Sequence, residues 1–143
     1  MAEKILFVGD LNEYGRSLQR YITLIDLGHI LEGISTVPVP WWPITDSGLI
    51  EKVTWKFKMP IDITGANRKI KEALKRVKYD IIWIEKGNTI RPKILRFIKK
   101  NFPSIKLISC SEDDMYANHN QSLFYRWGLR YYDIIFTTKT YNL

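Results

Sequence analysis

Short apolar runs that stop abruptly at polar residues recur along this chain of 143 residues. The run Ile81–Ile84 is followed at once by Glu85, Lys86 and Gly87, and segments 4–10 and 105–111 repeat the pattern. Strands of a parallel sheet are covered on both faces, so they show little polar alternation. The pattern therefore predicts buried parallel strands. Ligands of open α/β sheets bind just outside the carboxyl ends of such strands, so we expect function in the polar loops there.

Stretches with helical spacing separate these runs. We expect one helix to begin near residues 15–17 and to end at Gly28, where a left-handed stop is natural. Three more are expected from Asn67, as the cap, to about Lys78, from Arg91-Pro92 onward, and over about 120–131. The residues expected to face inward are Leu18, Tyr21, Ile22, Ile25, Ile70, Ala73, Leu74, Val77, Ile94, Leu95 and Ile98.

Two further strands are expected at residues 30–35 and 133–137, and the three prolines of segment 37–43 predict a loop. Segment 48–59 fits two patterns, because alternate residues from Val53 are apolar while Leu49, Ile50, Val53 and Phe57 have helical spacing. We favour a helix there, since Asp46-Ser47 can cap its start and Pro60 follows it.

The alternation of strands and helices predicts an α/β fold: a Rossmann-like, three-layer α/β/α sandwich with a mainly parallel five-stranded sheet. The length fits a single domain over residues 1–143. A lone Cys110 excludes an internal disulfide and suits a reducing compartment. No apolar run reaches the ~18 residues of a membrane span, and no signal peptide precedes the first strand, so we expect a cytoplasmic protein.

The formal net charge is +7, from 22 Lys and Arg against 15 Asp and Glu. Much of the positive charge falls in two predicted helices, at 68–78 and 91–100. A surface for nucleic acid or anionic lipid is one explanation. Solvated faces of amphipathic helices are the explanation we favour, because aromatic residues are not interleaved with these basic residues. We therefore expect no specific nucleic-acid partner.

The first loop offers a candidate ligand site at Asp10, Gly15, Arg16 and Ser17. Glycines allow a ligand close to the backbone, and a helix start with a guanidinium and a hydroxyl suits an anion. The loop matches neither the dinucleotide fingerprint nor a P-loop. An ordinary strand-to-helix turn explains the same residues equally well.

Two more loops carry candidates. Glu85, Lys86 and Gly87 end the central apolar run, either as ligand contacts or as an ion pair that fixes the loop. Three consecutive carboxylates, Glu112 to Asp114, follow the next strand, with His119 and Asn120 just beyond. His119 could act as a base, because histidine is the most common general base in enzymes. The acidic run fits a capped polar turn better than a metal site, because no second ligand cluster has matching spacing, so we expect no metal and no cofactor.

These loops also carry a family resemblance. Leu27-Gly28-His29 looks like the Gly-His turn of glycosyltransferases of the GT-B architecture. More specifically, the chain resembles the spore maturation protein CgeB family. The segments that carry the likeness are 5–10 with 15–20, 80–87 with 90–92, 113–115 with 119–122, and 133–139 with 141–142.

The resemblance implies the N-terminal, acceptor-side domain of a glycosyltransferase that moves a sugar from a nucleotide-sugar donor to an acceptor hydroxyl. It implies Asp113, Asp114 or His119 as catalytic base, with Asp10, Gly15, Arg16, Ser17, Glu85, Lys86, Gly87 and Asn120 around the ligands. The implied partners are the donor, an acceptor glycan or protein, and a C-terminal donor-binding domain that this chain lacks. Alone, this half would be inactive.

One other interpretation remains open, and a further one is considered and rejected. One is a non-catalytic Rossmann-like module that binds a glycan or a protein. The other is a receiver-like signalling domain, suggested by Asp10 after the first strand and by Thr137 and Lys139 at the last. The second interpretation fails on the central strand, which ends in Glu85-Lys86 where a phosphoacceptor aspartate should stand.

Overall fold

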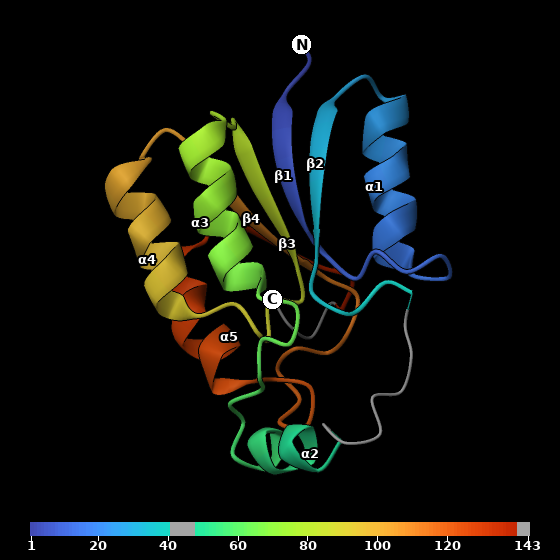
Figure 1. Cartoon of the computed structure of the whole chain (residues 1–143), viewed down its shortest axis with the longest axis vertical. Coiled ribbons are helices and arrows are strands. Elements are labelled where there is room, and N and C mark those ends of the chain that lie inside the picture. The colour runs from blue at the N-terminus through green and yellow to red at the C-terminus, as the bar shows by residue number, and fades with distance from the viewer. Residues whose placement is uncertain (41–47, 140–143) are drawn as a thin grey trace.

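Five parallel strands form the centre of the molecule (Figure 1). In a computed structural model, which describes residues 1–40 and 48–139, they are β1 (Lys4–Gly9), β2 (Ile30–Ser35), β3 (Ile81–Glu85), β4 (Lys106–Ser111) and β5 (Ile134–Thr137). Their order across the sheet is β2-β1-β3-β4-β5, and every neighbouring pair is parallel. The predicted α/β, Rossmann-like fold with a mainly parallel five-stranded sheet is confirmed.

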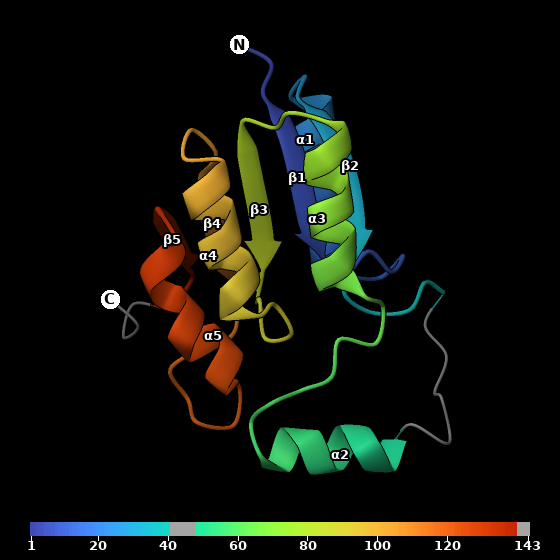
Figure 2. The same cartoon turned by 60° about the vertical axis from the view of Figure 1, so that its left-hand side comes forward.

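Helices cover both faces of the sheet. One face carries α1 (Arg16–Asp26), and the other carries α3 (Ala66–Arg76), α4 (Pro92–Asn101) and α5 (Leu123–Gly128), as Figures 1 and 2 show. A short 3₁₀ turn, η1 (Leu129–Tyr131), follows α5. Most of the predicted inward residues are buried, and these are Ile70, Ala73, Leu74, Ile94, Leu95 and Ile98. Together with the strand residues facing them they form the main hydrophobic core. Val77, which follows the end of α3, is only partly buried.

The opposite face is covered less completely, because α1 is the one helix there in the described part of the chain. A row of aromatic rings crosses this face. Phe7 stacks on Trp83 with 6.3 Å between ring centroids, and Trp83 stacks on Phe136 at 5.8 Å. The prediction that Ile22 and Ile25 face a core is wrong: both are exposed, since no second helix packs beside α1 in residues 1–40 and 48–139.

The start of α3 differs from the prediction. Gly65, not Asn67, is the residue before the helix, with a left-handed φ of 68°. Asp62 does the capping: its Oδ1 accepts from the Ala66 amide at 2.8 Å and its Oδ2 from the Asn67 amide at 2.9 Å. A carboxylate near a helix N-terminus satisfies free amides and matches the helix dipole. The Asn67 side chain is therefore available for a different task, a bond to the β3–α4 loop.

The last helix also begins later than expected. Ser122 caps α5 by accepting from the Tyr125 amide at 3.0 Å, so the helix starts at Leu123 rather than near residue 120. The remaining segment from residue 112 to 121 is a loop at the carboxyl edge of the sheet.

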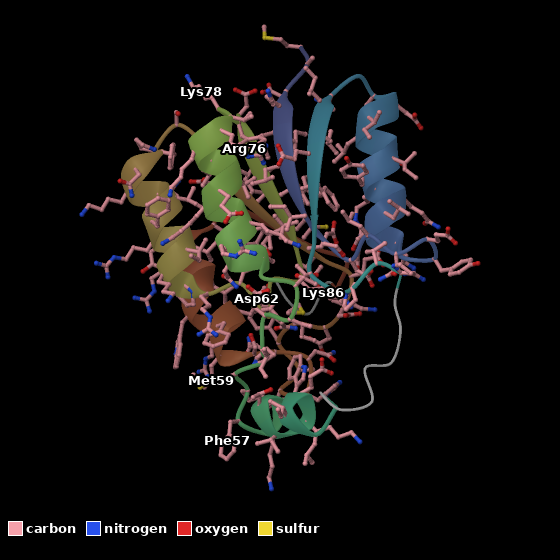
Figure 3. All side chains as sticks on the ribbon, viewed as in Figure 1. Phe57, Met59, Asp62, Arg76, Lys78 and Lys86 are labelled. Atoms are coloured by element: carbon pink, nitrogen blue, oxygen red, sulfur yellow. The ribbon has the colours of Figure 1, made fainter. Side chains whose placement is uncertain are left out.

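Segment 48–56 is helix α2 (Gly48–Lys56), as predicted, while its expected cap at Asp46-Ser47 lies outside the described residues. The helix lies beyond the carboxyl edge of the sheet (Figures 1 and 2). Just after it, the Leu123 amide donates to the Lys58 carbonyl at 2.7 Å. Leu49 on α2 and Phe57 just after the helix are about two-thirds or more exposed. Figure 3 places Phe57 at the end of the molecule opposite Lys78.

Strand β5 lies at one edge of the sheet, and its apolar side chains are only partly covered. Ile134, Ile135 and Phe136 are 43%, 40% and 48% exposed. None of the helices in the two described ranges has the length and apolar character needed to cross a membrane.

Candidate functional site

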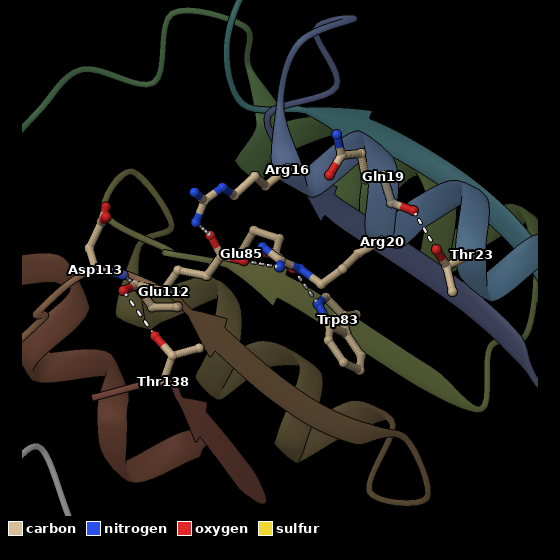
Figure 4. Close-up of polar contacts among 10 residues, drawn as sticks. Arg16, Gln19, Arg20, Thr23, Trp83, Glu85, Glu112, Asp113 and Thr138 are labelled. Carbon is tan, nitrogen blue, oxygen red and sulfur yellow. Dashed lines mark hydrogen bonds and ion pairs between the residues drawn. The ribbon is translucent and has the colours of Figure 1, made fainter. Parts of the chain in front are cut away.

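The carboxyl ends of β1, β3 and β4 bring three loops together. Because these strands are adjacent and parallel, residues 9–17, 85–88 and 111–113 lie at the same edge of the sheet. Contacts between charged side chains from all three loops define a carboxyl-edge network, formed by Arg16, Arg20, Glu85, Lys86, Glu112 and Asp113. Figure 4 shows most of these residues.

Glu85 is the buried centre of this network, with a side chain only 3% exposed. Arg20 makes two hydrogen bonds to the Glu85 carboxylate: Nε donates to Oε1 at 2.7 Å and Nη2 donates to Oε2 at 2.8 Å. Trp83 Nε1 adds a third donor to Oε1 at 2.8 Å (Figure 4). Two parallel bonds between a guanidinium and a carboxylate are the strong, direction-specific form of an ion pair. The bond to Glu85 raises the pKa of Arg20, so the arginine stays charged.

The same arginine also reaches the acidic loop after β4. Arg20 Nη1 donates to Glu112 Oε1 at 2.5 Å, and Arg16 Nη1 donates to Glu112 Oε2 at 2.7 Å. The hydrogen bonds from Arg16 and Arg20 lower the pKa of Glu112. On the other side, Thr138 Oγ1 donates to the Glu112 carbonyl at 3.1 Å. Helix α1 is thus connected through side chains to β3, to the β4 loop and to the end of β5.

Lys86 and Gly87 turn the chain sharply after Glu85. Both have positive φ, 60° for Lys86 and 74° for Gly87. The left-handed region suits glycine, whereas for lysine it carries a conformational cost that the surrounding contacts must offset. Lys86 Nζ pairs with Asp113 Oδ2 at 2.6 Å, and the Lys86 amide donates to the Cys110 carbonyl at 2.9 Å. The predicted ligand contacts at Glu85 and Lys86 are therefore both in ion pairs.

The first loop is ordered mainly by its own polar groups. Asp10 Oδ1 accepts from the backbone and side-chain nitrogens of Asn12 at 3.0 and 2.9 Å. Gly15 precedes α1 and provides no side-chain cap, and Ser17 is buried in the first turn. Arg16, expected to approach a phosphate, is held by Glu112 instead. Of the predicted ligand residues, Asp10, Ser17, Glu85, Lys86 and Gly87 line a common cavity, described below.

The three alternative candidates for the catalytic base lie in different local surroundings. Asp113 pairs with Lys86, while Asp114 Oδ1 accepts from the amides of Tyr116 and Ala117 at 3.1 Å, as in a local turn. His119 is exposed in the loop that follows. Asn120 is structural as well, since its side chain donates to the Asp114 carbonyl and its carbonyl accepts from Asn88 at 2.9 Å.

Sequence reasoning missed Arg20, Trp83 and Glu112 as parts of the network. A signal for two of them was present: residues 16 and 20 are one helical turn apart, and residues 83 and 85 point to the same side of a strand. Cys110 is buried in β4, and this burial raises the pKa of its thiol to about 11. Among the described residues, no group of three His, Cys, Asp or Glu is placed to hold a metal ion.

A cavity of about 480 Å³ opens beside the network. It lies where the strand order reverses, between the ends of β1 and β3, and helix α2 and the segment after it form its outer wall. Crevices at this switch point of open α/β sheets are the usual ligand sites of such folds. We call this cavity the switch-point pocket.

Comparison with known proteins gives a likeness at the level of fold. No family model matches the chain, and no curated protein matches it. Among solved structures, response regulator TrrA from Thermotoga maritima, in complex with Mg²⁺-BeF, has a TM-score of 0.52 at 12% identity, over 96% of this chain and 88% of that one. A signal receiver domain from Pseudomonas fluorescens Pf-5 has 0.51 at 15%, over 96% and 83%.

RcsB from Salmonella enterica serovar Typhimurium, bound to promoter rprA, has a TM-score of 0.50 at 8% identity, over 97% of this chain but 61% of its own. At such identities the likeness establishes the fold alone. The fold it establishes is the flavodoxin-type α/β fold, whose strand order of 2-1-3-4-5 is the order seen here.

These structures correct the functional prediction. They are receiver domains and not GT-B glycosyltransferases, so the CgeB resemblance, the spore-maturation and glycosyltransferase assignment, and the sugar-transfer function are wrong. The expected partners, which are a nucleotide-sugar donor, an acceptor and a missing donor-binding domain, are therefore wrong as well. The alternative prediction, a module that binds a glycan or a protein, does not match these structures either.

Proposed function

We propose that this chain is a receiver-type signalling module that changes state without accepting a phosphoryl group at the end of its central strand. The observation that carries the proposal is the state of Glu85. It occupies the end of β3, and both of its oxygens accept bonds from Arg20.

A carboxylate that accepts a phosphoryl group needs an accessible oxygen and cations that offset the incoming charge. Glu85 Oε1 is occupied by Arg20 and Trp83, and Oε2 is occupied by Arg20. The side chain is 3% exposed, and the part of the chain described here holds no group of acidic residues suited to a metal. These facts support a module whose central carboxylate is fixed rather than reactive.

The network also supports a role in signalling. Arg20 joins α1 to β3 and to the β4 loop, and Thr138 joins that loop to the end of β5. A change that separates Arg20 from Glu85 acts on three structural elements at once. Discrete rearrangements of such polar networks are one route by which a domain passes between two states.

The first experiment tests phosphoryl-group chemistry. TrrA, whose structure holds Mg²⁺-BeF, serves as the positive control. Each ¹⁵N-labelled protein is titrated with beryllofluoride and Mg²⁺ and followed by two-dimensional NMR. We expect saturable shifts in TrrA and none in this chain. Saturable shifts of residues 85–88 and 111–113 in this chain would contradict the proposal.

The second experiment tests whether the network is a switch. Arg20→Met removes the bonds to Glu85 and Glu112 and keeps most of the side-chain volume. We expect concerted changes in amide shifts along α1, in residues 85–88 and in β5. Gln19→Met, on the exposed side of the same helix, is the matched control. Changes confined to residues in direct contact with position 20 would show a static ion pair and would refute the signalling role.

A further inference from the structure

The switch-point pocket has two unlike sides. Its apolar wall comes from Val37 and Pro38 after β2, from Trp55 on α2, and from Ile61 and Ile63 beyond α2. Its other side is the carboxyl edge of the sheet. Cavities of several hundred Å³ with an apolar wall and a few polar groups are typical of small-molecule sites, and the volume of about 480 Å³ falls in this range.

The charged groups of the pocket do not balance. Among the described residues, four ionisable side chains line it, and these are Asp10, Glu51, Glu85 and Lys86. Glu85 is paired with Arg20 and Lys86 is paired with Asp113, so these two contribute little net charge. Within residues 1–40 and 48–139, Asp10 and Glu51 take part in no ion pair.

Asp10 accepts bonds only from neutral groups of Asn12 among the contacts of the described residues. Glu51 is half-buried on the inner side of α2, one helical turn from Trp55. The pocket is therefore negative although the whole chain carries +7. A partly enclosed carboxylate that has no cation beside it is stabilised most by a ligand that brings a positive charge.

We propose that the switch-point pocket binds a small organic cation, in which an ammonium group faces Asp10 and Glu51 and an apolar, ring-sized body packs against Trp55 and Ile63. The basis is the cavity, its apolar wall and its two unpaired carboxylates. The proposal of this binding site does not depend on whether the chain accepts a phosphoryl group, so the proposed function and the binding site can be tested independently.

Three probes of similar shape and different charge test the inference. They are 2-phenylethylamine, 2-phenylethanol and 3-phenylpropionate, each titrated into the ¹⁵N-labelled chain and followed by NMR. We expect saturable shifts of the amides at 36–37, 54–55 and 86–89 with the amine. Its affinity should exceed that of the alcohol and of the acid at least tenfold, which is roughly 1.4 kcal/mol.

Variants locate the effect. Asp10→Asn and Glu51→Gln should each weaken the amine several-fold and leave the alcohol unchanged. Trp55→Ala should weaken the amine and the alcohol alike. Glu13→Gln removes an exposed acid of the same first loop that does not line the pocket, and it should change nothing. Retained dispersion of the amide spectrum shows that each variant is folded.

Two results would overturn the inference. The first is equal affinity for the three probes, which would mean that charge plays no part. The second is a set of amide shifts that do not saturate with the amine and that decrease as much in Glu13→Gln as in Glu51→Gln. Such shifts would mean that the amine is only weakly attracted to acidic groups at the surface. Binding of the amine combined with saturable beryllofluoride shifts would refute the proposed function alone.

Discussion

Arg20 and Glu85 are 65 residues apart in the chain, yet their side chains form a two-bonded ion pair at 2.7 and 2.8 Å. The carboxylate is almost fully buried, and the arginine is about one-quarter exposed. The pair fastens α1 to the end of the central strand. Its removal is the sharpest test of what holds the carboxyl edge together.

Replacing Arg20 by Met leaves the Glu85 carboxylate buried without its cation, while the bond from Trp83 Nε1 stays. Breaking a buried pair by removing one partner commonly costs about 3 kcal/mol, because the other charge stays behind. We expect a loss of that size in the free energy of unfolding, measured by urea denaturation. The double variant Arg20→Met/Glu85→Gln removes the stranded charge and should regain part of the loss. Equal stability of the two variants would show that the buried charge is not the cause.

Acid should weaken the same network through Glu112. The hydrogen bonds from Arg16 and Arg20 lower its pKa in the folded state below the ordinary 4.5. A carboxyl group whose folded pKa is lowered adds stability that is present above the unfolded value and is lost as the pH falls through the folded one. We therefore expect the contribution of Glu112 to disappear progressively below about pH 4.5.

Urea denaturation at pH 7 and at a series of lower pH values measures this effect. Glu112→Gln should unfold more easily than the parent chain at neutral pH, and the difference should shrink toward acid. Glu13→Gln provides a control with an exposed acid of the same charge type. A difference between parent and Glu112→Gln that stays constant over this pH range would exclude the mechanism.

Gly9, the last residue of β1, leaves room for the Glu85 side chain. A Cβ at position 9 would lie 2.8 Å from Glu85 Cβ and 2.9 Å from its Cγ. Glu85 cannot move aside easily, because Arg20 and Trp83 hold its head group. Gly9→Ala should therefore cost roughly 1–3 kcal/mol, as other insertions into packed sites do.

Gly48→Ala is the matched control for Gly9→Ala. No described atom lies within 4 Å of a Cβ placed there, and the position is the first of helix α2. Thermal unfolding should show a lower midpoint for Gly9→Ala and an unchanged or slightly higher one for Gly48→Ala. A normal midpoint for Gly9→Ala would mean that the carboxyl edge adjusts more freely than its contacts indicate.

Asn67 connects α3 to the β3–α4 loop. Its buried side chain donates to Asp62 Oδ2 and to the Thr89 carbonyl, at 2.6 and 2.8 Å, and accepts from the Arg91 amide at 2.8 Å. Asn67→Ala leaves the Thr89 carbonyl and the Arg91 amide without this partner in a partly buried place, so we expect a loss of about 2–3 kcal/mol. Asn101→Ala removes an exposed asparagine that bonds only to its own helix and should change stability little. Chemical denaturation of both variants compares the two effects.

Much of the fold could be predicted, because its strongest signals are local. The continuous apolar run Ile81–Ile84 marks a central strand of the sheet. The stripe of Ile94, Leu95 and Ile98 marks the one buried side of a helix. The exposure of Ile22 and Ile25 could not be predicted, because it depends on which other helices cover the same face of the sheet. A stripe of apolar residues predicts a helix, but not how completely that helix is buried.

The network was harder to foresee than the strands. Arg20 resembles any basic residue on a helix surface, and its partner is chosen by strand order and register rather than by spacing in the chain. The mistaken glycosyltransferase assignment has a related cause. Segments such as 5–10 and 80–87 have the composition of any buried parallel strand that ends in a polar loop. They carry information about the fold, and they carry little about the chemistry.

The outer side of β5 has a practical consequence. Strand order places this strand at the border of the sheet, and Ile134 and Phe136 are more than two-fifths uncovered. Backbone hydrogen-bond donors and acceptors next to apolar side chains form a sheet edge to which an extended peptide can add as a further strand. Concentrated solutions of the protein should consequently be prone to aggregation. Ile135→Lys would place a charge on this edge strand and should reduce the aggregation.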